Sequence, residues 1–205
     1  MTRRTLVVVG NGMVGHKLLT TLAERGATAE WDIVTFCEEP RPAYDRVGLS
    51  TFFTGTSAEE LSLVSPGFFD AAGFEVHLGD AVAEIDRQAR KVVSRNGTVL
   101  TYDALVMATG SYPFVPLIAG NDAPGCFVYR TLEDLEAIRA YADGCRTGAV
   151  VGGGLLGLEA ANALRCLGLT THVVEFAPRL MPMQVDEGGG GSLRRLIEDL
   201  GVSIH

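Results

Sequence analysis

The stretch Thr5-Leu6-Val7-Val8-Val9-Gly10-Asn11-Gly12-Met13-Val14-Gly15 decides the fold of the N-terminal half of the chain. Its apolar, β-branched start predicts a buried parallel strand, and the residues from Met13 to Arg25 have helical spacing that ends at Gly26. The glycines between strand and helix have the G-x-G-x-x-G spacing of a dinucleotide-binding turn. A second strand over residues 32–36 leads to Glu38, near the offset of about 20 residues at which a carboxylate accepts from ribose hydroxyls.

The same order of features occurs a second time. The run Gly148-Ala149-Val150-Val151 predicts a strand, Gly152-Gly153-Gly154-Leu155-Leu156-Gly157 the turn, residues 155–167 a helix, and residues 171–174 a strand that ends at Glu175. Successive glycines of each motif would allow the tight turn, the approach of the backbone to a pyrophosphate and close helix–strand packing. Each helix N-terminus would then hold the phosphates. Glycine turns of an ordinary α/β protein are the alternative for either motif alone.

The segment between the two fingerprints changes character. Residues 57–60 form a capping box that predicts a short helix ending before Pro66. Alternation over residues 80–94 and a turn at 95–98 predict a small antiparallel insert, followed by a buried strand at 104–107. A proline-containing linker and a second capping box at 131–134 come next, opening a helix to about residue 142. The prediction is an α/β fold with two Rossmann-like domains, residues 1–113 and 114–205, each with a parallel sheet, the second one truncated.

Composition narrows the class of protein. The 205 residues carry a net charge of −8 and a pI near 5.0, which argues against nucleic acid and anionic membrane surfaces as partners. No stretch reaches about 18 apolar residues, and the first apolar run is too short for a signal peptide, so we expect a cytoplasmic protein. The 4 cysteines and 4 histidines are scattered without a metal-binding spacing, so no metal site is expected.

These features together resemble the two-dinucleotide flavoprotein family typified by glutathione reductase. Within that family, several segments are similar to the N-terminal region of the large subunit of assimilatory NAD(P)H nitrite reductase, and the likeness runs over nearly the whole chain. The segments that carry it are residues 36–40, 44–47, 58–64, 107–112, 127–131 and 150–160.

The resemblance implies FAD at the first fingerprint and NADH, with NADPH as the alternative, at the second. It implies that Glu38 binds the FAD ribose and that Arg46 binds the phosphate or ribityl side, although a solvated surface arginine is the simpler reading of Arg46 alone. Glu159 would lie near the junction of flavin and nicotinamide, with a solvent-facing helix charge as its alternative. The remaining implied contacts are Gly10, Gly12, Met13, Val14 and Gly15 at the FAD pyrophosphate, Ala81 and Val82 at the adenine, Ala108, Thr109 and Gly110 near the flavin, and Gly152, Gly154, Leu155, Leu156 and Gly157 at the second nucleotide.

The second acidic residue predicts a cofactor preference. A carboxylate at Glu175 accepts from the two ribose hydroxyls of NADH but repels the 2′-phosphate of NADPH. Arg179, four residues further on, could swing toward a 2′-phosphate and reduce the preference.

Two departures from the wider family refine the interpretation. The loop over residues 43–48 has no redox cysteine, which argues against disulfide or peroxide chemistry through a protein thiol. Thr51 follows Leu49-Ser50 where the rubredoxin and ferredoxin reductase branch usually has a lysine able to pair with the later glutamate. This difference favours the nitrite reductase branch.

The expected function is therefore an oxidoreductase module that passes electrons from NADH through FAD toward nitrite reduction. The iron–sulfur and sirohaem centres of that family are not encoded here, so we expect either a fragment of a longer enzyme or a degenerate short gene product. Downstream redox centres or a redox subunit are the expected partners, and a homodimer is left open. The alternatives are a non-catalytic nucleotide-binding remnant and an electron-transfer component similar to rubredoxin or ferredoxin reductases.

Overall fold

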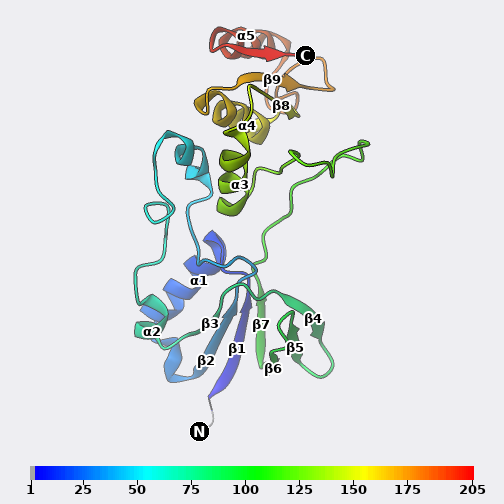
Figure 1. Ribbon diagram of the computed structural model, residues 1–205. Helices are drawn as coiled ribbons and strands as arrows, with labels where there is room; N and C mark the ends of the chain where they lie inside the picture. The colour runs from blue at the N-terminus through cyan, green and yellow to red at the C-terminus, as the bar shows by residue number, and fades with distance from the viewer. Residues whose placement is uncertain (1–2) are drawn as a thin grey trace. The chain divides into compact units, whose positions relative to one another are not determined.

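The computed structural model describes residues 3–205, which form two compact units (Figure 1). The first unit contains the chain up to Arg46 and the segment Ala58–Tyr112. The second contains Val47–Ser57 and Pro113–His205. The second unit thus takes in a short segment, Val47–Ser57, that the sequence analysis grouped with the first domain.

A four-stranded parallel sheet with the order β3-β2-β1-β7 forms the centre of the first unit. Strands buried on both faces need nearly continuous apolar sequence, and Val7 and Val8 are fully buried. Val9 pairs with Phe36 on one side and Met107 on the other, so three strands end at one edge of the sheet. The strands are β1 (Arg4–Val9), β2 (Trp31–Phe36), β3 (Glu75–His77) and β7 (Ala104–Met107).

The two faces of this sheet pack against different layers. One face, with Leu6, Val8 and Ile33, packs against Leu19 and Phe74 and against residues of the helices. The other face, with Val7, Val9, Val34 and Phe36, packs against Val92 of the small antiparallel sheet. The period of two along each strand produces this division. The helical elements of this layer are α1 (Met13–Glu24), the 3₁₀ turn η1 (Ala27–Ala29) and α2 (Phe68–Ala72).

The antiparallel insert is confirmed. It consists of β4 (Val82–Asp86), β5 (Lys91–Ser94) and β6 (Val99–Thr101) in the order β4-β5-β6. Gly97, at the turn between β5 and β6, has a φ of +91°, a conformation that residues with a side chain rarely adopt.

The helix predicted from the capping box at residues 57–60 is wrong. The segment instead makes turns and an antiparallel bridge between Tyr44 and Ser62. The amide of Leu63 donates to the carbonyl of Ala43 at 3.0 Å, and the carbonyl of Leu61 accepts from Asp45 at 2.8 Å. These backbone groups are engaged with another part of the chain, so they are not available for a helical ladder. The helical segment nearby lies earlier, in the 3₁₀ helix η2 (Val47–Thr54).

The second unit has a three-stranded parallel sheet in the order β10-β9-β8, as the repeated motif predicts. Its core contains Ala161 of α4, Val173 of β9, Leu180 and Val202 of β10. The elements are α3 (Leu132–Ala142), β8 (Thr147–Val151), α4 (Leu155–Cys166), β9 (Thr170–Val174), α5 (Glu187–Asp199) and β10 (Val202–Ile204).

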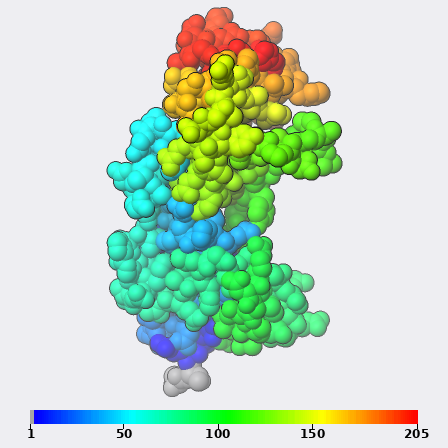
Figure 2. Space-filling model, viewed as in Figure 1, coloured from blue at the N-terminus to red at the C-terminus, as the bar shows by residue number. Residues whose placement is uncertain are grey.

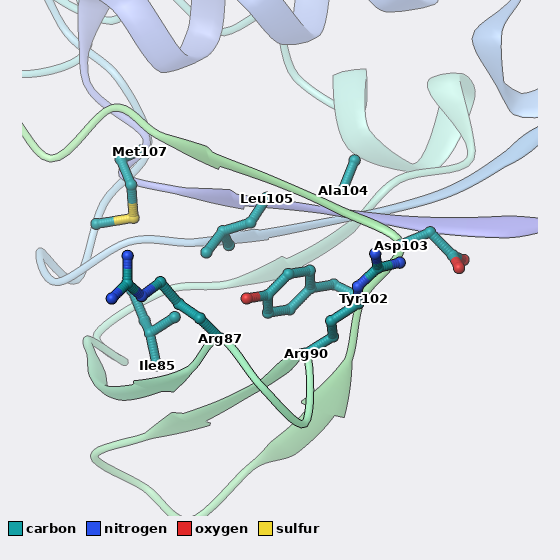
Figure 3. Close-up of a pocket in the computed structure, with 8 residues that line it drawn as sticks. All are labelled: Ile85, Arg87, Arg90, Tyr102, Asp103, Ala104, Leu105 and Met107. Carbon is teal, nitrogen blue, oxygen red and sulfur yellow. The ribbon is translucent and has the colours of Figure 1, made fainter.

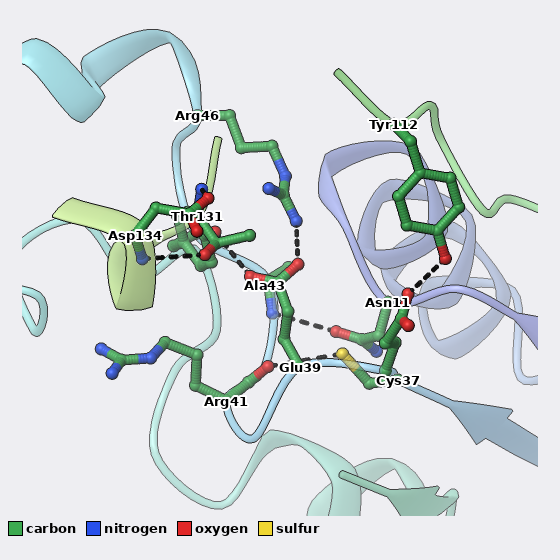
Figure 4. A network of polar contacts seen from close by, with 11 residues as sticks. Asn11, Cys37, Glu39, Arg41, Ala43, Arg46, Tyr112, Thr131 and Asp134 are labelled. Atoms are coloured by element: carbon green, nitrogen blue, oxygen red, sulfur yellow. Dashed lines mark hydrogen bonds and ion pairs between the residues drawn. The ribbon is translucent and has the colours of Figure 1, made fainter. Parts of the chain in front are cut away.

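The capping box before α3 is confirmed. The Thr131 hydroxyl accepts from the amide of Asp134 at 3.2 Å, and the Asp134 carboxylate accepts from the amide of Thr131 at 2.8 Å (Figure 4). Two backbone amides at the start of the helix, those of Thr131 and Asp134, therefore have hydrogen-bond partners.

The glycine tract at residues 188–191 lies inside α5. Asp186 caps the helix, and its carboxylate accepts from the amide of Gly189 at 2.7 Å. A Cβ at Gly190 would lie 2.9 Å from Cδ of Arg179, so the absence of a side chain lets the arginine stem pass against the helix.

Exposed apolar side chains follow the last strand of the first unit. Phe114 is 90% exposed and Leu117 is fully exposed, and Figure 2 shows the neighbouring segment, in bright green, standing out from the rest of the second unit.

Within residues 3–205, no helix is both long enough and apolar enough to cross a membrane.

Candidate functional site

The first glycine fingerprint is closely packed at two of its three glycines. Gly10 has a φ of +107°, and a Cβ there would lie 2.2 Å from the carbonyl oxygen of Ala108. A Cβ at Gly15 would lie 2.0 Å from the carbonyl oxygen of Gly10. No larger residue fits either position without moving backbone, so these glycines hold β1, α1 and the end of β7 together.

Gly12 is different because nothing lies within 4 Å of a Cβ built on it. Its φ of −92° is accessible to other residues, and it is the N-cap residue of α1. No side chain caps this helix and no acidic residue lies in its first turn. The side chain of Val14 in that turn is 74% exposed. The geometry thus leaves open space in front of free helix amides, which is what an approaching phosphate requires.

The carboxylate of Glu38 lies just beyond the end of β2, where the sequence predicts a ribose-binding acid. It accepts from the hydroxyl of Tyr112 at 2.6 Å and from the guanidinium of Arg95 at 3.4 Å. The hydrogen bond to Glu38 raises the pKa of the Tyr112 phenol. The side chain of Glu38 remains 45% exposed, so the carboxylate is also accessible to a ligand.

The predicted adenine contacts lie beside the predicted ribose contact. Arg95, whose side chain reaches Glu38, donates its backbone amide to the carbonyl of Ala81 at 2.7 Å, and Val82 begins β4 next to it. Glu38 and Ala81 are therefore linked through one residue of the hairpin, as a shared adenosine site would require.

The residues after β7 continue its pairing with β1. The amide of Ala108 donates to the carbonyl of Val9 at 2.7 Å. Thr109 and Gly110 follow, and Gly110 has a φ of +69°. The chain thus turns away from the sheet immediately beside Gly10, where a Cβ would meet the backbone of Ala108 and Thr109.

Arg46 has protein partners in this structure. Its guanidinium pairs with the carboxylate of Glu39 and lies 4.8 Å from the ring centre of Tyr44 (Figure 4). The Tyr44 hydroxyl also donates to Glu39, at 2.6 Å. Contact between Arg46 and FAD therefore stays a prediction.

Sequence reasoning missed three polar residues of this region. Arg95 and Tyr112 come next to Glu38 only through the fold, and no motif marks them. Asn11 lies inside the fingerprint and is 3% exposed, with its Oδ1 accepting from the amide of Ala43 at 3.0 Å (Figure 4). Its Nδ2 is buried and has no hydrogen-bond partner among the described residues. The signal available in the sequence was a polar residue between Gly10 and Gly12 of the turn.

The second fingerprint repeats the geometry of the first, except that a Cβ at Gly152 would meet nothing within 4 Å. Gly152 has a φ of +112°, and a Cβ at Gly157 would lie 2.0 Å from its carbonyl oxygen. Gly154 is the N-cap of α4, and a Cβ there would meet nothing within 4 Å. This helix also has no side-chain cap, and Leu155 and Leu156 in its first turn are more than half exposed.

Glu175 is held at the second turn by backbone amides. Its carboxylate accepts from the amide of Gly153 at 2.6 Å and from that of Ala177 at 2.7 Å. A carboxylate has further lone pairs, so ribose hydroxyls can still be accepted. Arg179 donates to the carbonyls of Val185 and Pro182, both at 3.1 Å, so its guanidinium is engaged away from the position that the sequence analysis considered for a 2′-phosphate.

Glu159 lies on α4, five positions after Gly154. Burial raises the pKa of its carboxyl group above the ordinary value. Burial, and next the charge of Glu159, raise the pKa of Tyr129 to about 12. The charge of Glu159 thus affects Tyr129, while burial alone accounts for the raised pKa of Glu159. The proximity of Glu159 to a flavin stays a prediction.

A hollow of about 590 Å³ lies on the first unit between β7 and the antiparallel sheet (Figure 3). None of the predicted site residues lines it, so it is separate from the candidate nucleotide sites. Its lining residues are Ile85, Arg87, Arg90, Tyr102, Asp103, Ala104, Leu105 and Met107.

No group of three or more His, Cys, Asp or Glu residues suited to a metal is found within residues 3–205.

Comparison with known proteins gives close relatives over the whole chain. The chain is 53% identical over 205 residues to the nitrite reductase (NADH) large subunit of Escherichia coli and 56% identical to the nitrite reductase [NAD(P)H] large subunit of Klebsiella oxytoca. Both alignments include 100% of this chain but only 24% and 21% of the two relatives. The chain therefore spans less than a quarter of their length.

The fold also matches solved structures. A ferredoxin reductase from Rhodopseudomonas palustris superposes with a TM-score of 0.89 at 27% identity, over 99% of this chain and 50% of that one. The predicted α/β class with two parallel sheets is confirmed. The resemblance to nitrite reductase large subunits is confirmed as well. The family model for pyridine nucleotide-disulphide oxidoreductases matches residues 4–205, and the chain belongs to that family.

Proposed function

We propose that the first unit of this chain binds FAD and the second binds NADH, and that together they pass electrons from NADH toward nitrite reduction. The observation that carries the proposal is a contrast among the four long helices of the described residues. The two that follow a glycine fingerprint, α1 and α4, have uncapped N-termini behind an open glycine. The other two, α3 and α5, are capped by Thr131 and Asp186.

The residues present fit the two nucleotides. At the first site, Gly12 leaves room for a pyrophosphate, Glu38 offers a ribose acceptor, and the buried Nδ2 of Asn11 is a donor without a partner among residues 3–205. At the second site, Gly154 leaves the same room and Glu175 is the ribose acceptor. Bound FAD supplies the ability to take two electrons from a hydride donor and to release them singly.

The protein's own contribution is binding and orientation. Helix amides fix each pyrophosphate, and the carboxylates Glu38 and Glu175 fix the adenosine halves. Glu159, placed on α4 beyond the second pyrophosphate site, is proposed to lie beside the nicotinamide end. Nitrite as the final acceptor is supported by the 53–56% identity to nitrite reductase large subunits.

A second candidate is electron delivery to a small redox protein. The structural likeness to a ferredoxin reductase favours it, and so does 30% identity over 202 residues to the ferredoxin–NAD(+) reductase subunit of a Pseudomonas putida benzene dioxygenase system. Thr51, in place of the lysine expected in that branch, argues for the nitrite-related function instead.

The test is an anaerobic titration of the flavin-loaded protein with NADH, in which the absorption bands of the flavin are monitored. We expect the bands to bleach with wild type. Gly154→Val should keep the flavin and lose the bleaching, because its new side chain occupies the space proposed for the NADH pyrophosphate. A protein that takes up no FAD, or a Gly154→Val variant that bleaches as fast as wild type, refutes the proposal. Comparing oxidised ferredoxin-type proteins with oxidised nitrite-reducing centres as electron acceptors then separates the two candidate functions.

A further inference from the structure

Tyr112 makes a hydrogen bond to the carboxylate that the proposed function assigns to the FAD ribose. Its hydroxyl donates to Oε2 of Glu38 at 2.6 Å, a length typical of a charge-assisted bond between a hydroxyl and a carboxylate (Figure 4). The other oxygen, Oε1, accepts from the guanidinium of Arg95 at 3.4 Å. Both oxygens of Glu38 therefore have a protein donor, and the phenol is the closer of the two.

The ring of Tyr112 lies further into solvent than the carboxylate it contacts. Tyr112 is 79% exposed, whereas the side chain of Glu38 is 45% exposed. Among residues 3–205, no aromatic ring packs on it. The hydrogen bond to Glu38 is thus the main contact that fixes the phenol, and moving the ring aside disturbs little packing.

The phenol stays a donor at neutral pH. The hydrogen bond to Glu38 and the charge of that carboxylate raise the pKa of the Tyr112 phenol, so the hydroxyl keeps its proton. A ribose also offers hydroxyl donors, and in a dinucleotide site they are accepted by the acidic residue after the second strand. The phenol and the ribose are therefore the same kind of donor for one carboxylate.

Two such donors weaken each other. A carboxylate that already accepts a short hydrogen bond has given up part of its charge to that bond, so it is a poorer acceptor for the next hydroxyl. Because Tyr112 lies on the solvent side of Glu38, it also stands where a ligand arrives. Binding of a ribose at Glu38 consequently works against the bond to Tyr112.

We propose that Tyr112 competes with the FAD ribose for Glu38 and moves away from the carboxylate when FAD binds. This inference rests on the proposed binding of FAD in the first unit. It goes beyond that proposal, because a competing residue lowers the affinity for FAD below the value that the ribose site alone would give. A residue that contacted FAD would have the opposite effect.

Equilibrium titration of the flavin-free protein with FAD, monitored by flavin fluorescence, tests the competition. Tyr112→Phe removes only the hydroxyl. It should bind FAD roughly three- to tenfold more tightly than wild type, the gain expected from removing one competing hydrogen bond at an exposed position. Tyr102→Phe is the matched control, since Tyr102 is a tyrosine of the same unit that lines the separate hollow. It should leave the Kd unchanged.

A second variant ties the effect to the carboxylate. Glu38→Ala should weaken FAD binding, because the ribose loses its acceptor. In the Glu38→Ala background, Tyr112→Phe should leave the Kd unchanged, since no carboxylate remains for the two hydroxyls to share. FMN, which contains the flavin but no adenosine, should bind to wild type and to Tyr112→Phe with the same affinity.

The outcomes separate this inference from the proposed function. If Tyr112→Phe binds FAD no more tightly than wild type, or gains as much affinity when Glu38 is absent, the competition is refuted while FAD binding stands. An equal gain for FMN refutes it as well. If neither wild type nor Tyr112→Phe binds FAD, the proposed first site fails and this inference with it.

Discussion

Replacing Gly12 and Gly15 by valine should separate ligand binding from folding within one motif. A Cβ at Gly12 meets nothing within 4 Å, and its φ of −92° suits valine. Losing glycine at an N-cap costs about 1 kcal/mol, and the reduced freedom of the unfolded chain offsets about half of this or more. A Cβ at Gly15 lies 2.0 Å from the carbonyl oxygen of Gly10, so α1 must move away from β1. Such overpacking costs roughly 3 kcal/mol or more.

The two variants should lose FAD for different reasons. In Gly12→Val the new side chain fills the space proposed for the pyrophosphate, so two charge-assisted hydrogen bonds of about 1.5 kcal/mol each are lost. Their sum of about 3 kcal/mol corresponds to a roughly hundredfold weaker Kd. Gly15→Val should lose FAD only because the unit unfolds.

Trp31 makes the assay specific, because it is the 1 tryptophan of the chain and lies in β2 of the first unit. Urea unfolding followed by its fluorescence reports the stability of that unit, and FAD fluorescence reports binding. A Gly12→Val variant that binds FAD as tightly as wild type refutes the assignment of the first motif. A Gly15→Val variant as stable as wild type refutes the packing argument.

Three further predictions concern the second unit. Thr131→Ala removes the cap of α3 and should destabilise that helix by about 1 kcal/mol, seen as faster amide exchange in its first turn; unchanged exchange would contradict the capping role. Glu175→Ala should reduce a preference for NADH over NADPH of roughly ten- to a hundredfold, measured as the ratio of their Kd values, because the carboxylate repels a 2′-phosphate; a ratio equal to that of wild type would remove Glu175 as the discriminating residue. Glu159→Gln should unfold at a higher temperature than wild type at pH 7 and at the same temperature at pH 4. Burial raises the pKa of the Glu159 carboxyl group, so the folded state favours its protonated form. The wild type therefore loses stability as pH rises from the pKa of the unfolded state through that of the folded state. A temperature difference that is the same at both pH values would show that Glu159 ionisation does not affect stability.

Much of the fold was predictable because each element carries its own pattern. The apolar runs that became β1 and β8, the helices after each fingerprint and the turn at Gly97 follow from apolar periodicity and from glycine chemistry. The capping box at Thr131 was also a local signal and proved correct.

The failed helix at residues 57–60 shows where local signals stop. That segment carries the same type of capping box as Thr131, yet residues 61 and 63 pair with the chain at 43–45. Long-range pairing outweighs a capping preference of about 1 kcal/mol, and a sequence pattern does not reveal it.

The candidate site likewise contains residues that local sequence signals predict and residues that they do not. The fingerprint glycines follow from spacing, because the turn, the open cap and the close packing each require a glycine at a fixed offset. The partners of Glu38 do not, since Arg95 and Tyr112 are 57 and 74 residues away in the sequence. The pairing of Arg46 with Glu39 was likewise invisible, because both are common surface residue types and only the fold brings their side chains together.

The central claim is that each unit holds its own dinucleotide, and calorimetric titration of three proteins tests it most directly. Wild type should bind one FAD and one NADH per chain. Gly12→Val should lose FAD alone, and Gly154→Val should lose NADH alone, because the two open glycines lie in different units. A single variant that loses both ligands without unfolding, or a wild type in which FAD and NADH compete for one site, would contradict the account.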